Sequence, residues 1–474
     1  MNSSDFHQRA ATALGDPVLQ TALGRLEAGF SAGRRDAVLR LENFEALRDR
    51  AVEICDHTLD NLDHYLEQFE TALTARGGVV HWCADAQAAR QVALSLLQQA
   101  DVRRVVKSKS MIAEEIDLNP YLEAAGIEVV ETDLGENIIQ LAGEPPSHII
   151  APALHKTRAQ VDDLFRAAHG SNRNDEEVRS ARELVDEARR VTREKFLTAD
   201  AGITGANFLI AETGSIVLVT NEGNADLGHC LPPLHIAITS IDKVIPGLDD
   251  AAVLLRLLAR SATGQDISTY TSFVTGADNP DAFHLILLDN GRSEMLGGKF
   301  REMLRCVKCG ACLNHCPVYA AVGGHAYGSV YPGPMGAVLM PLIAEKGGLA
   351  AHADLPQASS FCGRCEDVCP VRIPLPDLMR QWREDAFEQK ITKPAERYLI
   401  AIWSWLAAHP RLYRLAVRSG LIAARLFGRL SGQTGQFGDL SILGKFGSGW
   451  TKGRDFPAPA KRSFMDQWHS KQND

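Results

Sequence analysis

The stretch RCVKCGACLNHCPVY, residues 305–319, holds four cysteines in the spacing C-x2-C-x2-C-x3-C, with a proline directly after the last one. In bacterial proteins with this pattern, three thiolates bind one iron–sulfur cluster and the fourth binds the other cluster of a pair. Zinc sites instead place a longer loop between two short cysteine pairs. The stretch therefore predicts a module that holds two iron–sulfur clusters.

A second stretch, SSFCGRCEDVCPVRI at residues 359–373, has the same form but only three cysteines, with Ser359 at the position of the first. The last cysteine of each motif is expected to cross to the other cluster. One cluster is then complete, with the ligands Cys306, Cys309, Cys312 and Cys369. The other has only three cysteines, which are Cys316, Cys362 and Cys365.

The missing eighth ligand leaves three alternatives for the second cluster. It is a [4Fe–4S] cluster with a ligand other than cysteine, such as Ser359, a nearby carboxylate or water. It is a [3Fe–4S] cluster that lacks the unheld iron, or its open iron binds substrate. We favour two [4Fe–4S] clusters, the second with an exchangeable fourth position.

The two motifs belong to a helical module. Between them lie 45 residues, 317–361, which is more than a compact bacterial ferredoxin needs, and the segment GAVLMPLIAEKGGLAAHA has a helical pattern. We therefore predict an α-helical ferredoxin-type module over residues 296–390. Two neighbouring clusters in one module would carry electrons.

The chain before this module alternates between short apolar runs and amphipathic helical patterns. Such alternation predicts an α/β domain with a largely parallel sheet, placed here at residues 77–295. Glycine, asparagine and proline separate the runs. The predicted strands lie at residues 77–84, 103–108, 126–133, 147–153, 207–213, 214–221, 234–240 and 283–290.

Polar residues follow several of these strands and are candidates for a binding pocket, because pockets in open α/β sheets form at the carboxyl ends of strands. Lys107 and Lys109 stand where a strand meets a helix, which is a place suited to an anion. A capping turn with solvated lysines is the simpler alternative. Further candidates surround the turns after two other strands, where ordinary turn formers are the alternative. They are Glu212, Thr213, Ser215, Asn221, Glu222 and Asn224.

Both ends of the chain are predicted to be helical. In the N-terminal segment, residues 1–76, one apolar stripe recurs at helical spacing. The stripe consists of Leu59, Leu62, Leu66, Phe69 and Leu73. In the C-terminal region, residues 391–474, the apolar run 398–408 is too short to span a bilayer. Peripheral membrane contact, docking on a partner and a packed helix pair are the alternatives for this tail.

Charge separates the tail from the rest of the chain. The net charge is −9, and residues 391–474 carry 13 Lys and Arg against 5 Asp and Glu, so residues 1–390 carry −17. An acidic body argues against nucleic acid as a partner. No secretory signal pattern opens the sequence. We expect a cytoplasmic protein with reduced thiols, with membrane association only through the tail.

Several segments together resemble the lactate-utilization protein B family, the iron–sulfur subunit of a three-part L-lactate oxidising system. The resemblance covers residues from about 60 to 465. It rests on VKSKSMIAEEIDLN, VVETDLGENIIQL, HIIAPALHK, AETGSIVLVTNEGN, CVKCGACLNHCPVY, GGHAYGSVYPGPMGAV and SSFCGRCEDVCPV.

The resemblance implies a LUD-type α/β domain, similar in fold to the sugar-phosphate isomerase and coenzyme A transferase group. It also implies that the seven motif cysteines bind the clusters. The implied function is electron transfer during oxidation of L-lactate to pyruvate, with two sister subunits as partners. No flavin or nicotinamide fingerprint is present, so we expect the carbon chemistry in a partner. The alternatives are a LUD domain that itself binds or converts lactate or an acyl substrate, and a redox-sensing interaction protein.

Overall fold

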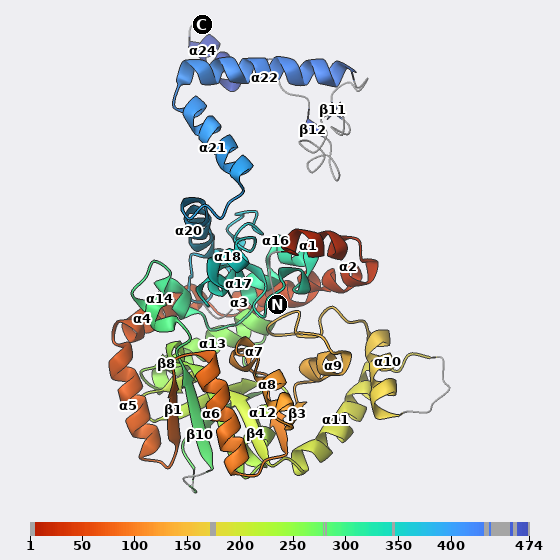
Figure 1. The fold of residues 1–474 in the computed structure, drawn as a ribbon, viewed down its shortest axis with the longest axis vertical. Coiled ribbons are helices and arrows are strands. Elements are labelled where there is room, and N and C mark those ends of the chain that lie inside the picture. The colour runs from red at the N-terminus through yellow and green to blue at the C-terminus, as the bar shows by residue number, and fades with distance from the viewer. Residues whose placement is uncertain are drawn as a thin grey trace. The chain divides into compact units, whose positions relative to one another are not determined.

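The protein forms two compact units, residues 1–388 and 389–474 (Figure 1). The computed structural model describes residues 5–170, 177–277, 279, 282–343, 347–430, 436–437, 456–457 and 462–472. The predicted domain boundaries at residues 76 and 295 both fall inside the first unit, and they stay predictions.

A six-stranded parallel sheet forms the centre of the first unit, in the order β1-β10-β7-β4-β2-β3. Its strands are β1 (Val79–Cys83), β10 (Phe283–Leu288), β7 (Leu234–Ser240), β4 (Ala201–Gly205), β2 (Arg104–Lys107) and β3 (Glu128–Glu131). Helices connect most of these strands, as parallel pairing requires. The predicted α/β class is confirmed.

Both faces of this sheet are covered, and the strands are accordingly apolar on both sides. In β10, Ile286 and Leu288 belong to one hydrophobic cluster and Leu285 and Leu287 to the other. Helices α6 and α8 pack on the first face, and α5 together with a smaller sheet packs on the second. The connecting helices are α6 (Ala86–Gln99), α7 (Met111–Glu115), α8 (Leu118–Ala124), α9 (Leu134–Ala142), α10 (Arg158–His169), α11 (Ala181–Leu197), α12 (Asn224–Cys230), η3 (Ile241–Lys243) and α13 (Leu248–Thr263).

The smaller sheet has four strands in the order β8-β5-β6-β9. They are β8 (Val244–Ile245), β5 (Phe208–Ile210), β6 (Ser215–Thr220) and β9 (Tyr270–Val274). Strand β6 runs antiparallel to both β5 and β9. The loops before and after β6 therefore lie at opposite ends of the strands of this sheet. This separates several of the predicted pocket residues.

The N-terminal segment is helical, as predicted. It comprises α1 (Phe6–Leu14), α2 (Pro17–Leu23), η2 (Glu27–Ser31), α3 (Ala32–Leu39), α4 (Phe44–Asp60) and α5 (Leu62–Thr74). The predicted apolar stripe is buried, with Phe69 and Leu73 fully enclosed. The stripe is divided between α4 and α5, because the chain leaves helical geometry at Asn61 (φ −129°).

The prediction of a strand at residues 147–153 is wrong. This segment forms bends and turns. Its polar groups bind each other and the part of the chain that carries both cysteine motifs, residues 292–388, which we call the cysteine module. The Ser147 carbonyl accepts a 2.6 Å hydrogen bond from the Tyr319 hydroxyl. His148, fully buried, lies 2.9 Å from the Asn314 side chain. The apolar residues of this run are buried against another module, which gives the same sequence pattern as a strand.

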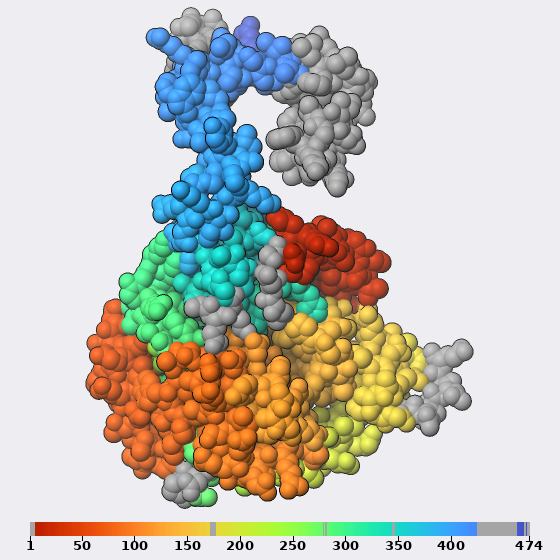
Figure 2. All heavy atoms as spheres, in the orientation of Figure 1, coloured from red at the N-terminus to blue at the C-terminus, as the bar shows by residue number. Residues whose placement is uncertain are grey.

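The cysteine module is built from short helices, as predicted. They are α14 (Arg292–Leu296), η4 (Arg301–Arg305), α15 (Ala311–Asn314), α16 (Pro317–Val322), η5 (His325–Tyr327), α17 (Gly333–Leu339), η6 (Met340–Leu342), α18 (Gly348–His352), α19 (Arg364–Asp367) and α20 (Leu375–Glu388). Figure 2 shows the N-terminal helices (red) beside this module (cyan). A Cβ atom at Gly324 would lie 1.7 Å from the Ser147 carbonyl oxygen, so the module contacts the α/β domain backbone to backbone.

The second unit contains α21 (Pro394–Ala407), α22 (Pro410–Leu430), β11 (Gln436–Phe437), β12 (Phe456–Pro457) and α24 (Phe464–Gln472). None of the residues of α21 is buried, and Trp403 is 62% exposed. No helix in the described part of the chain is both long and apolar enough to cross a membrane. Membrane contact through the tail stays a prediction.

A buried ionic network joins the α/β domain to the cysteine module. Arg292 forms a bidentate pair with Glu115, at 3.0 and 2.8 Å, and a further 3.0 Å contact with Asp242. The Tyr331 hydroxyl donates to Glu115 at 2.7 Å. Burial alone would raise the pKa of Glu115, but Arg292 and Lys308 outweigh it and lower this pKa to about 2. Glu115 is therefore ionised at neutral pH.

Replacing Arg292 with Met should be strongly destabilising, because it leaves Glu115 as a buried carboxylate without its bidentate partner and removes one of the two cations that contact Asp242. Breaking a buried pair in this way costs about 3–5 kcal/mol. The matched control is Arg103→Met, whose partner Asp101 lies 4.0 Å away with both side chains exposed; it should cost less than about 1 kcal/mol. Urea unfolding followed by circular dichroism measures both. Equal midpoints for the two variants would contradict a structural role for the network.

Candidate metal centre

The first cysteine group lines a small cavity between the two motif loops. It consists of Cys306, Cys309, Cys312 and Cys369, so it takes three cysteines from the first motif and one from the second. The remaining wall is mostly apolar and includes Ile149 from the α/β domain. All ten cysteines of the chain are free thiols. Unpaired thiols that line a small, mostly apolar cavity are the donor set that iron–sulfur clusters use.

The second group lines another small cavity and consists of Cys316, Cys362 and Cys365. Here the first motif supplies one cysteine and the second supplies two. Ser359 and Ser360 also line this cavity. Cys362 is exposed, whereas no cysteine of the first group is. The second group therefore lies nearer the surface.

The two motif loops have the same backbone conformation. Gly310 and Gly363 both have positive φ (74° and 80°), and so do the non-glycine residues Lys308 and Phe361 (53° and 51°), two positions earlier. After these left-handed turns, the short helices α15 and α19 begin at the residue that follows Gly310 and Gly363. The repeat extends to one further hydrogen bond.

That hydrogen bond connects the first side chain of each loop to a backbone N–H two residues later. Lys308 N–H donates to Cys306 Sγ at 3.4 Å. Phe361 N–H donates to Ser359 Oγ at 3.1 Å. Ser359 therefore occupies the same place in its loop as Cys306 does, with oxygen in place of sulfur.

The thiols are held in surroundings that favour their protonated form. Burial raises the pKa of Cys309 to about 12 and that of Cys369 to about 11. Burial and the nearby Cys316 raise the pKa of Cys365 to about 12. Metal ligation requires the thiolate, so bound cations must supply the compensating charge. The Ile373 N–H, which donates to Cys369 Sγ at 3.4 Å, adds a hydrogen bond of the kind that tunes a cluster.

Two buried arginines from the N-terminal helices hold the second motif in place. Arg34 donates to the Val368 carbonyl at 2.9 Å. Arg48 donates to the Cys369 carbonyl at 2.7 Å and to the Asp367 carbonyl at 2.9 Å. Both side chains are more than nine-tenths buried. They place positive charge beside the first cysteine group, which suits a site that binds an anionic thiolate cluster.

A larger cavity of about 360 Å3 lies at the carboxyl ends of the α/β strands. Its apolar wall includes Phe30, Ile149 and Leu258. Val307 and Lys308, from the loop between Cys306 and Cys309, also line it. A molecule in this cavity would therefore lie against the first cysteine loop.

The cavity brings together four of the eight predicted pocket residues: Lys109, Asn221, Glu222 and Asn224. Lys109 donates to the Ile150 carbonyl at 2.8 Å. Burial and Asp133 raise the pKa of Glu222. These residues follow strands β2 and β6 on the side where the cysteine loop docks.

The other four candidates do not line this cavity. Glu212, Thr213 and Ser215 lie at the opposite end of β6, where the Thr213 hydroxyl donates to Ser215 Oγ at 2.7 Å. Lys107 is fully buried inside the domain and pairs with Glu131 at 2.8 Å and Glu114 at 3.2 Å. Burial alone would lower its pKa, but these carboxylates raise it. Lys107 is thus a buried counterion.

The prediction missed two cavity lysines. Lys243 follows β7 and donates to the Cys306 carbonyl at 2.7 Å. Lys243 follows the carboxyl end of a predicted strand, which is the criterion that the other candidates met. Lys308 donates to the Tyr331 hydroxyl at 3.0 Å, and burial lowers its pKa to about 7. Lys308 stands between two cysteines, where spacing alone gives no sign of a second cavity.

Three family models match the chain. The LUD domain matches residues 66–293, the 4Fe-4S dicluster domain residues 302–373, and the C-terminal domain of lactate utilisation protein B residues 388–473. Lactate utilization protein B of Lysinibacillus sphaericus is 42% identical over 98% of this chain and 96% of its own length. The chain belongs to the lactate utilization protein B family.

Two further relatives have the same extent. The family member of a Geobacillus strain is 41% identical over 100% of this chain and 98% of its own length. An uncharacterized electron transport protein of Escherichia coli, YkgF, is 41% identical over 99% of this chain and 97% of its own. The family resemblance seen in the sequence is confirmed, and the dicluster match supports iron–sulfur binding at residues 302–373.

Proposed function

We propose that this chain is the iron–sulfur electron-transfer subunit of a system that oxidises L-lactate to pyruvate. The observation that carries the proposal is the gathering of seven free cysteines into two groups, each drawn from both motifs. The dicluster match and the relatives named for lactate utilization and for electron transport support it. Clusters bound at the two groups would carry electrons one at a time.

The ligand sets follow from the two groups. The first cluster is held by Cys306, Cys309, Cys312 and Cys369, and the second by Cys316, Cys362 and Cys365. We propose Ser359 as the fourth ligand of the second cluster, because its loop repeats the backbone and the hydrogen bond of Cys306. Among the described residues that line the second cavity there is no carboxylate. Both clusters are then of the [4Fe–4S] type.

Electrons pass from the buried first cluster to the second, and leave near the exposed Cys362. Oxidation of lactate to pyruvate releases two electrons and two protons, so two single-electron carriers match one turnover. Phe361, beside Cys362, lies under the guanidinium of Arg383, 4.1 Å from the ring centroid. A partner with an acidic surface suits this end of the path. The two sister subunits are the proposed partners, and one of them performs the carbon chemistry.

The crossed ligand sets give a direct test. Cys369→Ser should damage the same cluster as Cys306→Ser, although the two residues lie in different motifs. Cys316→Ser should damage the other cluster. Anaerobic electron paramagnetic resonance with iron counting distinguishes the two signals. If Cys369→Ser instead matched Cys365→Ser, each motif would hold its own cluster and the assignment would be wrong.

Ser359 has a matched control in its neighbour Ser360, which lines the same cavity. Wild-type protein with two [4Fe–4S] clusters contains about eight irons per chain. Ser359→Ala should lower this to about seven, with a three-iron signal in anaerobically purified protein. Ser360→Ala should keep all of them. If both variants keep the full iron content, water or another group fills the fourth position.

A second candidate function is supported by the larger cavity, which adjoins the first cysteine loop. Lys109, Lys243 and Lys308 line it together with Asp133, Glu222 and an apolar wall. Cationic and apolar surfaces together suit a small carboxylate such as lactate or an acyl group. In this alternative the LUD domain itself binds the substrate, and electrons enter the first cluster directly.

Equilibrium binding of radiolabelled L-lactate to the cluster-loaded protein tests this candidate. Lys109→Met should weaken binding about tenfold or more, because it removes a cation from the cavity wall. The control Lys195→Met changes a partly exposed lysine, which pairs with Glu128 and does not line the cavity. Lack of lactate binding by wild-type protein would rule out this candidate and leave the electron-transfer proposal intact.

A further inference from the structure

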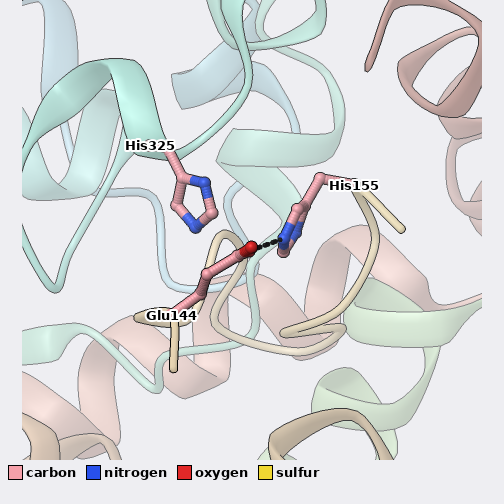
Figure 3. A group of neighbouring side chains, drawn as sticks. All are labelled: Glu144, His155 and His325. Carbon is pink, nitrogen blue, oxygen red and sulfur yellow. Dashed lines mark hydrogen bonds and ion pairs between the residues drawn. The ribbon is translucent and has the colours of Figure 1, made fainter. Parts of the chain in front are cut away.

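Two histidines and a glutamate meet where the α/β domain contacts the cysteine module (Figure 3). Glu144 and His155 lie between α9 and α10, and His325 begins η5 of the module. One ligand atom from each of the three lies within 4.8 Å of the others. None of these residues has a role in the function proposed above.

The hydrogen bonds of His155 fit a tautomer in which one ring nitrogen is free. The Ser147 hydroxyl donates its one proton to the Pro152 carbonyl at 2.9 Å. In the tautomer that uses this bond, the hydroxyl accepts from His155 Nδ1, which lies 2.7 Å away, Nδ1 carries the proton, and the lone pair of the neutral ring is on Nε2. That nitrogen lies 2.7 Å from the Glu144 carboxylate, so a proton or a bound metal ion must offset the repulsion of two facing lone pairs.

The hydrogen bond of His325 also leaves one nitrogen free. Its Nε2 lies 2.8 Å from the Pro145 carbonyl, which can only accept, so Nε2 carries the proton. Nδ1 then has the lone pair. Lys156 holds the other oxygen of Glu144 at 2.5 Å. Each histidine thus donates one N–H to a neighbouring oxygen and keeps the other nitrogen for a ligand, as metal-binding histidines do.

We infer that Glu144, His155 and His325 bind a divalent transition-metal ion of the zinc type. Two imidazoles and one carboxylate form a recurrent three-ligand set for such ions, with a further position open. Ligand atoms bound to zinc at about 2.1 Å are about 3.4 Å apart, so the His155 and Glu144 atoms, now 2.7 Å apart, need to separate by about 0.7 Å and the His325 nitrogen needs to close by at most about 1.4 Å. The charge of the ligands indicates the charge of the ion. One carboxylate and two neutral imidazole rings are a suitable set for a divalent cation.

The open coordination position faces a cavity of about 330 Å3, lined also by Asp16, Gln160 and Lys156. Water or a small ligand in this cavity completes the coordination. Because His325 comes from the module and the other two ligands from the α/β domain, the ion joins the two. It acts at the contact where Gly324 lies against the Ser147 carbonyl.

Zinc binding to the cluster-loaded protein tests the inference. Protein with full iron content is used so that the cysteines are occupied, and zinc is titrated against a chromophoric chelator. We expect about one zinc ion per chain. His155→Ala, His325→Ala and Glu144→Gln should each weaken binding at least tenfold, with unchanged iron content. Ser147→Ala should weaken it about 10–100-fold, because it removes only the partner of Nδ1.

His64→Ala is the matched control, since His64 is exposed and does not line the cavity; its zinc affinity should equal that of wild type. His325 is half-buried, and the unchanged iron content of His325→Ala checks that the module stays folded. A His155 ring that donates a proton from Nε2 to Glu144, with or without a second proton on Nδ1, is the arrangement that holds no metal. Absence of zinc uptake by wild type, or equal affinity in His64→Ala and His325→Ala, would establish that arrangement and overturn the inference.

Discussion

The hydrogen bond from Lys243 to the Cys306 carbonyl is the contact on which the architecture depends, because it connects a strand end to a cysteine loop. Lys243 is itself held by Asp242, and Arg292 binds Asp242 and Glu115 together. A chain of opposite charges thus extends from the sheet into the module. Buried charges are costly unless each has a partner, so the network fixes one relative arrangement of the two. It also explains why the large cavity and the first cysteine group share a wall.

The cysteine module could be predicted from the local spacing of its cysteines. Which residues line the large cavity depends on the direction of the strands, and local spacing does not give that direction. The cysteine motifs fix their own loops, so their grouping could be predicted without the fold. Glu212 and Glu222 look equivalent in sequence, but they lie at opposite ends of β6, and only pairing decides which end meets the cavity. Lys107 and Lys109 are two residues apart, yet the first ends a buried strand and the second lies beyond it. Sequence patterns therefore predict helices and strands better than they predict which end of a strand lies at a binding site.

The segment at 147–153 shows why an apolar run can mislead. A buried strand and a loop buried beneath another module have the same composition, since both lose contact with water. The difference lies in where the backbone groups bond, and here they bond to Tyr319 and to a side chain of the same segment. The same segment supplies Ile149 to the first cysteine cavity and Ser147 to His155. The segment therefore contacts Tyr319, the first cysteine cavity and His155, and its backbone does not pair with a strand.

The duplicated loops explain how the chain tolerates serine where a cysteine stands in the twin motif. The turn is fixed by positive φ angles and by an N–H donated to the first side chain, and these do not require sulfur. An oxygen accepts the same hydrogen bond at 3.1 Å, so Ser359 preserves the loop. The change falls on the group that includes the exposed Cys362, while the buried group keeps four thiols. In the proposed assignment, the cluster near the surface is held partly by oxygen and the other wholly by sulfur. Burial, charge and ligand type would then give the two clusters different reduction potentials.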